Sequence, residues 1–215
     1  MESIKVWDIF IRVFHWALVG SMIGLYVSGE EMQGVHSRLG YFVIALVMAR
    51  IVWGFIGPKH ARFGDFLYRP TDIFHYLKSL FVGKPIHYVG HNPAGGLMVF
   101  VMLIALLATT FAGLNALAAK GKGPLASTDL SILSSAHADE DEHGEDEKYH
   151  STSFRHSQKD EFWKEIHEGM TGVMLFLIII HICGVLVSSW RHKENLILSM
   201  ITGRKYFPVP RHDRP

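Results

Sequence analysis

The chain has 215 residues, of which 49% are hydrophobic, and its formal net charge at pH 7 is +1. Its long apolar runs exclude an ordinary soluble domain, and its charge gives no indication of a nucleic-acid partner. The single cysteine, Cys183, excludes an internal disulfide, a cysteine-rich zinc site and covalent haem attachment through a Cys-x-x-Cys-His motif.

Four apolar runs approach or reach the roughly 20 residues that a bilayer-spanning helix requires. In chain order they cover about residues 10–28, 36–57, 94–119 and 166–189. We therefore predict an all-α fold in which a single membrane domain, residues 1–215, forms a four-helix transmembrane bundle in contact with lipid. A long acidic loop, about residues 120–163, is predicted between the third and fourth helices.

The charges of the connecting segments predict the orientation of the helices. Basic residues gather in the N-terminal segment, in the connection before the third run and in the C-terminal tail. Residues 119–165, in contrast, hold eleven acidic residues and six basic ones. Because cytoplasmic segments carry the excess of lysine and arginine, both termini are predicted to be cytoplasmic and the acidic loop to face outward.

Two connecting segments have patterns of their own. Residues 69–85, "RPTDIFHYLKSLFVGKP", predict a short interfacial helix, because Ile73, Tyr76, Leu77 and Leu80 share one helical face. The acidic loop contains "SSAHADEDEHGEDEKYHSTSFRHSQKDE", whose composition is typical of a disordered, solvated segment. A docking surface for a basic partner and a weak metal-binding tract remain open. Helical pattern is expected to resume at Asp160 or Glu161.

Four histidines lie in or at the ends of the apolar runs: His15, His36, His167 and His181. A histidine in a membrane helix is costly, so it indicates either a functional site or a hydrogen bond to a neighbouring helix. His167 and His181 are fourteen positions apart. That spacing is about 1400°, close to four full turns, and about 21 Å along the axis. Both residues therefore share one helical face at two different depths.

The predicted helix directions pair the histidines by depth. His15 and His181 fall on the cytoplasmic side, whereas His36 and His167 fall on the outer side. Two imidazoles on opposite sides of an iron are what a bis-histidine haem requires. Gly40 and Gly184 lie near the ligands and allow either a flat macrocycle or a packed helix to approach. The sequence thus predicts two stacked, non-covalent haems of the b type that act as electron carriers.

Four motifs carry a resemblance to a known family: "RVFHW", "HSRLGY", "GHNPAGG" and "HEGMTGVMLFLIIIHICG". The chain resembles the cytochrome b561-like membrane subunits of bacterial nickel–iron hydrogenases and related respiratory complexes. The resemblance implies two haems b held by the four membrane histidines. It also implies an inner-membrane subunit, rather than an independent catalyst, that passes electrons between a periplasmic redox protein, such as a hydrogenase or a c-type cytochrome, and the quinone pool.

The resemblance and the residues together indicate further site residues. The related formate dehydrogenase subunit places its quinone beside an asparagine that matches Asn92, although the surrounding motif differs. Asn92 also reads as a helix cap before Pro93. His91 is a candidate donor or acceptor of a quinone proton. Arg38, the only basic residue of the first outer connection, is the favoured partner for a haem propionate.

Two other classes of function remain open. Some four-helix proteins of the b561 type oxidise superoxide and reduce quinone, which would make the chain an enzyme. A metal-ion transporter with a histidine-rich loop would contain carboxylates beside its membrane histidines, but only Glu168 lies near a run. An absorption spectrum separates these readings, because the transporter would be colourless.

Overall fold

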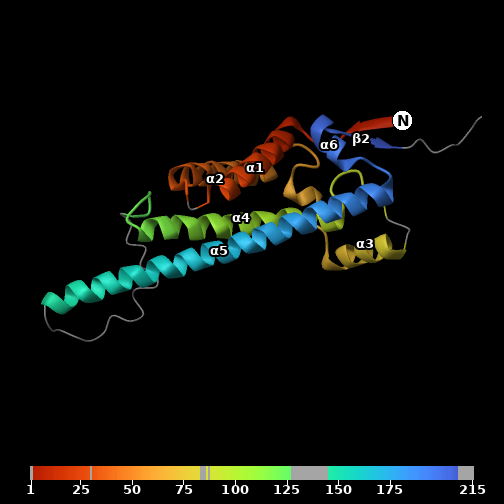
Figure 1. The fold of residues 1–215 in the computed structure, drawn as a ribbon. Helices are drawn as coiled ribbons and strands as arrows, with labels where there is room; N and C mark the ends of the chain where they lie inside the picture. The colour runs from red at the N-terminus through yellow and green to blue at the C-terminus, as the bar shows by residue number, and fades with distance from the viewer. Residues whose placement is uncertain (1, 30, 83–85, 87, 127–144, 208–215) are drawn as a thin grey trace, which may run out of the picture. The chain divides into compact units, whose positions relative to one another are not determined.

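A computed structural model describes residues 2–29, 31–82, 86, 88–126 and 145–207. Its helices are α1 (Ile9–Ser28), α2 (Gln33–Ile56), η1 (Phe63–Asp65), α3 (Pro70–Val82), α4 (Pro93–Ala119), α5 (Glu145–His192) and α6 (Leu196–Thr202), and its strands are β1 (Glu2–Lys5) and β2 (Arg204–Phe207) (Figure 1). The docking hypothesis rests on Asp139–Glu147 and the metal-binding hypothesis on His137, His143, His150 and His156, and the side chains of all these residues lie outside the described ones.

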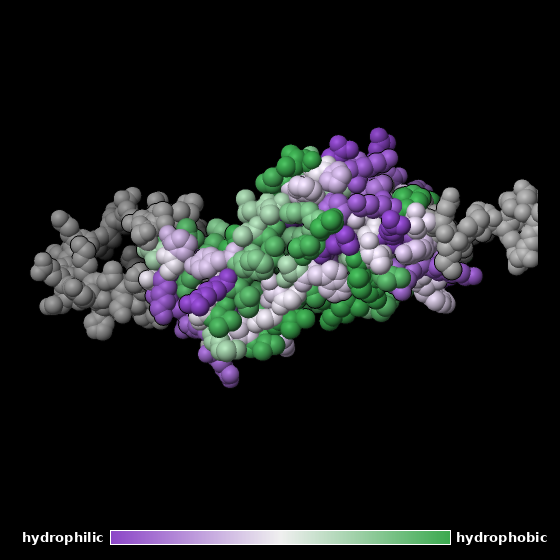
Figure 2. Space-filling model, turned by 90° about the horizontal axis from the view of Figure 1, so that it is seen from above, coloured by the Kyte–Doolittle hydropathy of each residue, from purple (hydrophilic) through white to green (hydrophobic). Residues whose placement is uncertain are grey.

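Four of these helices are long and apolar enough to cross a membrane, which confirms the all-α fold and the four predicted spans. They are α1, α2, α4 and the Asp160–His192 section of α5. Most of their side chains are not buried within the protein. Figure 2 shows hydrophobic residues gathered over the face in view, as a surface in contact with lipid requires. The chain is thus a multi-pass membrane protein, whereas the orientation of its termini remains a prediction.

The fourth long helix begins earlier than the sequence pattern predicted. We expected helix from Asp160 or Glu161, but α5 already begins at Glu145. The predicted loop, about 120–163, is therefore helical in its last part. A helix that already exists extends without a new nucleation cost, so a polar segment continues a membrane helix more easily than it forms one alone. Lys164 and Glu168, whose charged atoms are 3.6 Å apart, add a favourable pair one turn apart.

The described contacts divide the chain into two parts: Met1–Ile104 with Phe176–Pro215, and Ala105–Leu175. In the first part, α1 packs against α2, and Gly24 lies so close to Leu39 that an added Cβ would be 2.9 Å from the leucine side chain. The side chain of Asp8 caps α1 by accepting a hydrogen bond from the Ile11 amide at 2.9 Å. The second part takes the end of α4 and the beginning of α5.

The first part also contains the two short strands and the short helix α3. β1 pairs antiparallel with β2, so that Ile4 lies opposite Lys205. The predicted interfacial helix is present as α3, although its apolar face is not uniform: Tyr76 is only 1% exposed, whereas Leu77 is 40% exposed. Tyr76 is buried because its ring packs against Tyr88 and its hydroxyl hydrogen-bonds His192 Nε2 at 3.2 Å.

Candidate functional site

Two of the membrane histidines, His15 of α1 and His181 of α5, face each other. Their ring centres are 6.4 Å apart and their planes are tilted by 51°. A metal–nitrogen bond of about 2.0 Å on each side, plus about 1.2 Å from each nitrogen to its ring centre, gives about 6.4 Å. Rotation about the metal–nitrogen bonds leaves the angle between the planes unrestricted. The spacing therefore fits two axial ligands of one iron.

The surroundings of this pair also fit a buried cofactor. His15 Nδ1 is shielded from solvent and has no hydrogen-bond partner among the described residues. Buried polar atoms are normally satisfied, so an unsatisfied one indicates a group that the protein chain alone does not supply. An added Cβ at Gly184, three residues after His181, would meet no described atom within 4 Å. Gly184 itself is exposed, so a neighbouring group has room to approach α5 at this position.

His36, at the beginning of α2, has a defined hydrogen-bond geometry. Its Nδ1 lies 3.1 Å from the backbone carbonyl of Leu25 and 3.4 Å from Ser28 Oγ. Because a carbonyl oxygen only accepts, the contact with Leu25 places the proton on Nδ1 and makes Nε2 the basic nitrogen. Metal-binding histidines commonly donate their other ring nitrogen to a carbonyl in this way.

His167 in α5 repeats this arrangement in the second part of the structure. Its Nδ1 lies 2.9 Å from the carbonyl of Thr109 in α4, so Nε2 is again the basic nitrogen. Gly113, one turn after Thr109, permits the approach, because an added Cβ would be 2.9 Å from His167 Cε1 and 3.0 Å from Nδ1. The predicted pairing of His36 with His167 stays a prediction.

The close approach at Gly113 gives a testable expectation. Gly113→Ala should displace the His167 ring from the Thr109 carbonyl and lower the content of the haem that His167 is predicted to bind, because ring atoms cannot give way as a flexible chain end can. The matched control is Gly169→Ala on α5, where an added Cβ meets no described atom within 4 Å. A pyridine haemochrome assay of both variants measures the effect. Equal haem content in the two would show that His167 does not need this position.

Two arginines near the end of α2 and the beginning of α1 have buried donors. Arg50 is 3% exposed, its guanidinium lies 4.8 Å from the centre of the Phe63 ring, and its Nη1 has no partner among the described residues. Arg12 Nη1 donates to the Ile201 carbonyl at 2.6 Å, whereas its Nε is buried without a described partner. Anchoring to lipid headgroups would leave such groups exposed. Arg38, the favoured sequence candidate, is exposed.

His91 lines a cavity of about 220 Å³ in the first part of the structure, between residues 59–68 and 88–91. Its ring packs between Phe66, at a centre distance of 4.4 Å, and Trp7, at 4.6 Å. Burial lowers the pKa of His91 to about 3, and the positive charges of Arg50 and Lys205 act in the same direction. The ring is therefore neutral at pH 7. Its Nδ1 is buried without a partner among the described residues.

Asn92 caps α4, as one of its two sequence readings predicted. Its Oδ1 accepts from the Gly95 amide at 2.7 Å, and its Nδ2 is 3.5 Å from Ser188 Oγ. Both ends of the amide thus have partners, and Asn92 is not among the residues that line the cavity. The capping role does not test a contact between Asn92 and quinone.

The sequence did not indicate the buried charges of the tail as site residues. Lys205 and Glu194, whose side chains are 6% and 3% exposed, form an ion pair at 3.7 Å beside the segment that carries His91. From the sequence, both appear as ordinary polar residues of a terminal segment, and only their apolar neighbours in sequence, such as Ile197 and Tyr206, indicate that the segment packs against the rest of the protein.

The metal-transporter hypothesis requires a cluster of metal-binding side chains. The described residues hold no group of three histidine, cysteine or carboxylate side chains that could bind a metal ion.

Comparison with known proteins places these features in context. Residues 6–203 match the family described as Prokaryotic cytochrome b561. Proteins named "Probable Ni/Fe-hydrogenase B-type cytochrome subunit" are similar to this chain. The one from Rhizobium leguminosarum bv. viciae is 25% identical over 96% of this chain and 90% of its own length. The one from Bradyrhizobium diazoefficiens is 22% identical over 95% and 87%, respectively. No solved structure matches the chain significantly.

Proposed function

Because the chain belongs to the prokaryotic cytochrome b561 family, we propose that it carries electrons across the bacterial inner membrane between a periplasmic redox partner and the quinone pool. The match over residues 6–203 confirms the resemblance that the sequence motifs carried. The observation that supports the proposal most is the separation of 6.4 Å between the His15 and His181 rings. His15 and His181 would together hold the iron of one haem, which would then serve as an electron carrier without an open site for oxygen or substrate.

The proposed cofactors are two haems b. His15 and His181 would hold one near the cytoplasmic side, and His36 and His167 would hold the other near the periplasm. When bound, each haem supplies a one-electron redox centre. The Nδ1 hydrogen bonds of His36 and His167 orient the rings so that Nε2 would be the nitrogen that binds the iron. Arg50 Nη1 and Arg12 Nε are donors suited to the propionates of the inner haem, and Arg38 remains the candidate for the outer haem.

The proposed quinone site is the cavity beside His91. Its volume of about 220 Å³ is below the ~300–1,000 Å³ of drug-sized ligand pockets, so it suits a headgroup with its tail outside. The imidazole of His91, which is neutral at pH 7, offers a hydrogen bond to a quinone oxygen. Asn92 then acts by holding the beginning of α4, with a direct quinone contact as the alternative.

The proposed periplasmic partner is a nickel–iron hydrogenase, because the similar curated proteins are named as hydrogenase cytochrome subunits. A c-type cytochrome would use the same route. Both termini are proposed to be cytoplasmic, which puts His91 and the pair His15–His181 on the cytoplasmic side.

Proteoliposomes that enclose ferricyanide test the proposed function. Menadiol added to the bilayer should reduce the enclosed ferricyanide faster with this chain than in empty vesicles, and His181→Ala should abolish the difference. Equal rates with and without the chain would overturn electron transfer across the membrane. A second arm adds a nickel–iron hydrogenase and hydrogen as the reductant of menadione. Menadiol activity without hydrogen-dependent activity would reject the hydrogenase as partner but retain the electron carrier.

A further inference from the structure

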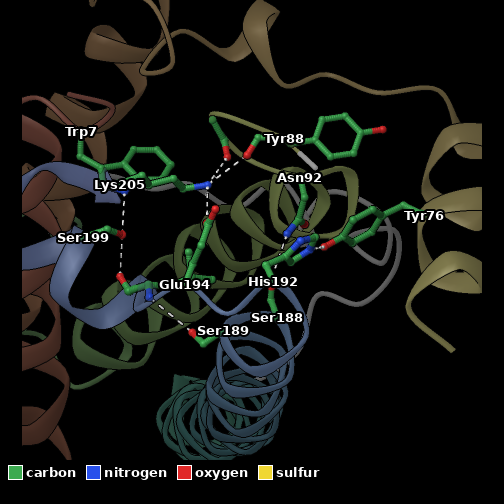
Figure 3. Close-up of polar contacts among 12 residues, drawn as sticks. Trp7, Tyr76, Tyr88, Asn92, Ser188, Ser189, His192, Glu194, Ser199 and Lys205 are labelled. Carbon is green, nitrogen blue, oxygen red and sulfur yellow. Dashed lines mark hydrogen bonds and ion pairs between the residues drawn. The ribbon is translucent and has the colours of Figure 1, made fainter. Parts of the chain in front are cut away.

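Residues 88–91 form one wall of the cavity and, in the described part of the chain, belong to no helix or strand. Side chains donate to carbonyls of this wall instead. Lys205 Nζ donates to the carbonyls of Tyr88 at 3.1 Å and Gly90 at 3.3 Å (Figure 3). The Tyr68 hydroxyl donates to the carbonyl of His91 at 2.9 Å. The path of this wall, and hence the place of the His91 ring, depends on donors that lie far from it in sequence.

Lys205 is itself held in place. Its ammonium group pairs with the Glu194 carboxylate at 3.7 Å, and both side chains are almost fully buried. Burial lowers the pKa of Lys205, and the charge of Glu194 opposes that shift. A buried charge is costly unless it is paired and hydrogen-bonded, so this ammonium has a strong preference for one position. Glu194 precedes α6, whose cap is Asn195.

The same terminal pair of strands also supports the ring of His91. β2, which carries Lys205, pairs with β1, and Trp7 lies two residues after the end of β1. The backbone amide of Trp7 donates to the Gly203 carbonyl at 3.1 Å, and its ring packs against the His91 ring at 4.6 Å. One side of His91 and the carbonyls before it are thus fixed by residues next to the paired termini.

We propose that Lys205 is a positioning residue of the quinone site, which acts by fixing the Tyr88–His91 segment so that His91 faces the headgroup. The inference rests on the proposed function, because it assumes that quinone binds beside His91. Without Lys205, His91 would still be present but would spend less time in the binding position. The apparent affinity then falls by the fraction of chains in that position, whereas the rate with quinone bound is retained.

The test compares quinol oxidation by haem in three variants. Lys205→Met alone would remove the cation of a buried ion pair and leave its anion in place, so the informative variant is Lys205→Met with Glu194→Gln, which removes both charges together. Its KM for menadiol should rise about tenfold with kcat nearly unchanged, as expected for a reduced competent fraction. Lys5→Met, which removes an exposed lysine of the adjacent strand, is the matched control and should keep the wild-type KM.

Each outcome decides the proposal. An unchanged KM in the double variant overturns the proposal. A tenfold fall in kcat also overturns it, because Lys205 would then act in the reaction itself rather than in positioning His91. Loss of haem from the double variant also overturns it, because Lys205 would then support the haem-binding end as a whole. His91→Ala in the same assay separates a failure of the Lys205 proposal from a failure of the proposed quinone site. If His91→Ala alone is slow, only the role of Lys205 fails, and if neither differs from wild type, the quinone site lies elsewhere.

Discussion

His181→Ala should lower the haem content from two haems per chain to about one, and so should His167→Ala. The reason is the stagger of about 21 Å between the two residues along α5, which assigns them to different haems. In His181→Ala the lost haem is the one that His15 and His181 would share at their ring separation of 6.4 Å. A pyridine haemochrome assay of the purified variants measures the content.

The matched control for these variants is His75→Ala, because His75 is an exposed residue of α3 outside the four spans. Its haem content should equal that of the wild type. Redox titration should show that His181→Ala and His167→Ala lose different midpoints. Full haem content in either ligand variant would reject its assignment, and loss of the same haem in both would reject the pairing by depth.

His91→Ala should slow the reaction of haem with quinol by about tenfold, as expected for the loss of one hydrogen bond of about 1.4 kcal/mol to the quinone, and leave haem content unchanged. The imidazole lines the cavity, is neutral at pH 7 and has a buried Nδ1 without a described partner. Stopped-flow reduction by menadiol measures the rate. A wild-type rate in this variant would place the quinone elsewhere.

Substitutions of Asn92 provide a second test, because different substitutions distinguish its role as the cap of α4 from a direct contact with quinone. Asn92→Ser keeps a capping oxygen, whereas Asn92→Ala removes it and should cost about 1 kcal/mol of stability. If Asn92 only caps α4, as its 2.7 Å contact with the Gly95 amide indicates, Asn92→Ser should react with menadiol at nearly the wild-type rate. A slow Asn92→Ser with normal stability would instead indicate a direct quinone contact.

The membrane helices could be predicted from the sequence because their signal is local. A run of apolar residues with the length of a bilayer is sufficient, and the predicted ends of the first three spans lie within a few residues of α1, α2 and α4. The beginning of α5 was predicted too late, because the polar composition of the segment before Asp160 indicates only how that segment would behave as an isolated peptide. Glu145 belongs instead to a helix that is already nucleated in the membrane.

The site was predictable only where depth and helical periodicity determine it. His15 and His181 were paired by depth from the directions of their helices, and their ring centres lie 6.4 Å apart, whereas their role as haem ligands stays a prediction. Lys205 was counted only as a positive charge of the tail, because its hydrogen bond to the Tyr88 carbonyl joins residues 117 positions apart. The burial of Arg50 was likewise not indicated by the sequence, because it follows from packing against Phe63, which lies beyond the helix.

The central claim, a carrier with two bis-histidine haems, is tested most directly on the purified wild-type chain. Quantitative pyridine haemochrome together with electron paramagnetic resonance of the oxidised protein should give two haems b per chain, both low-spin, and the reduced protein should not bind carbon monoxide, because both axial positions of each iron are filled. A colourless protein, a single haem per chain, or a high-spin haem that binds carbon monoxide would contradict the account.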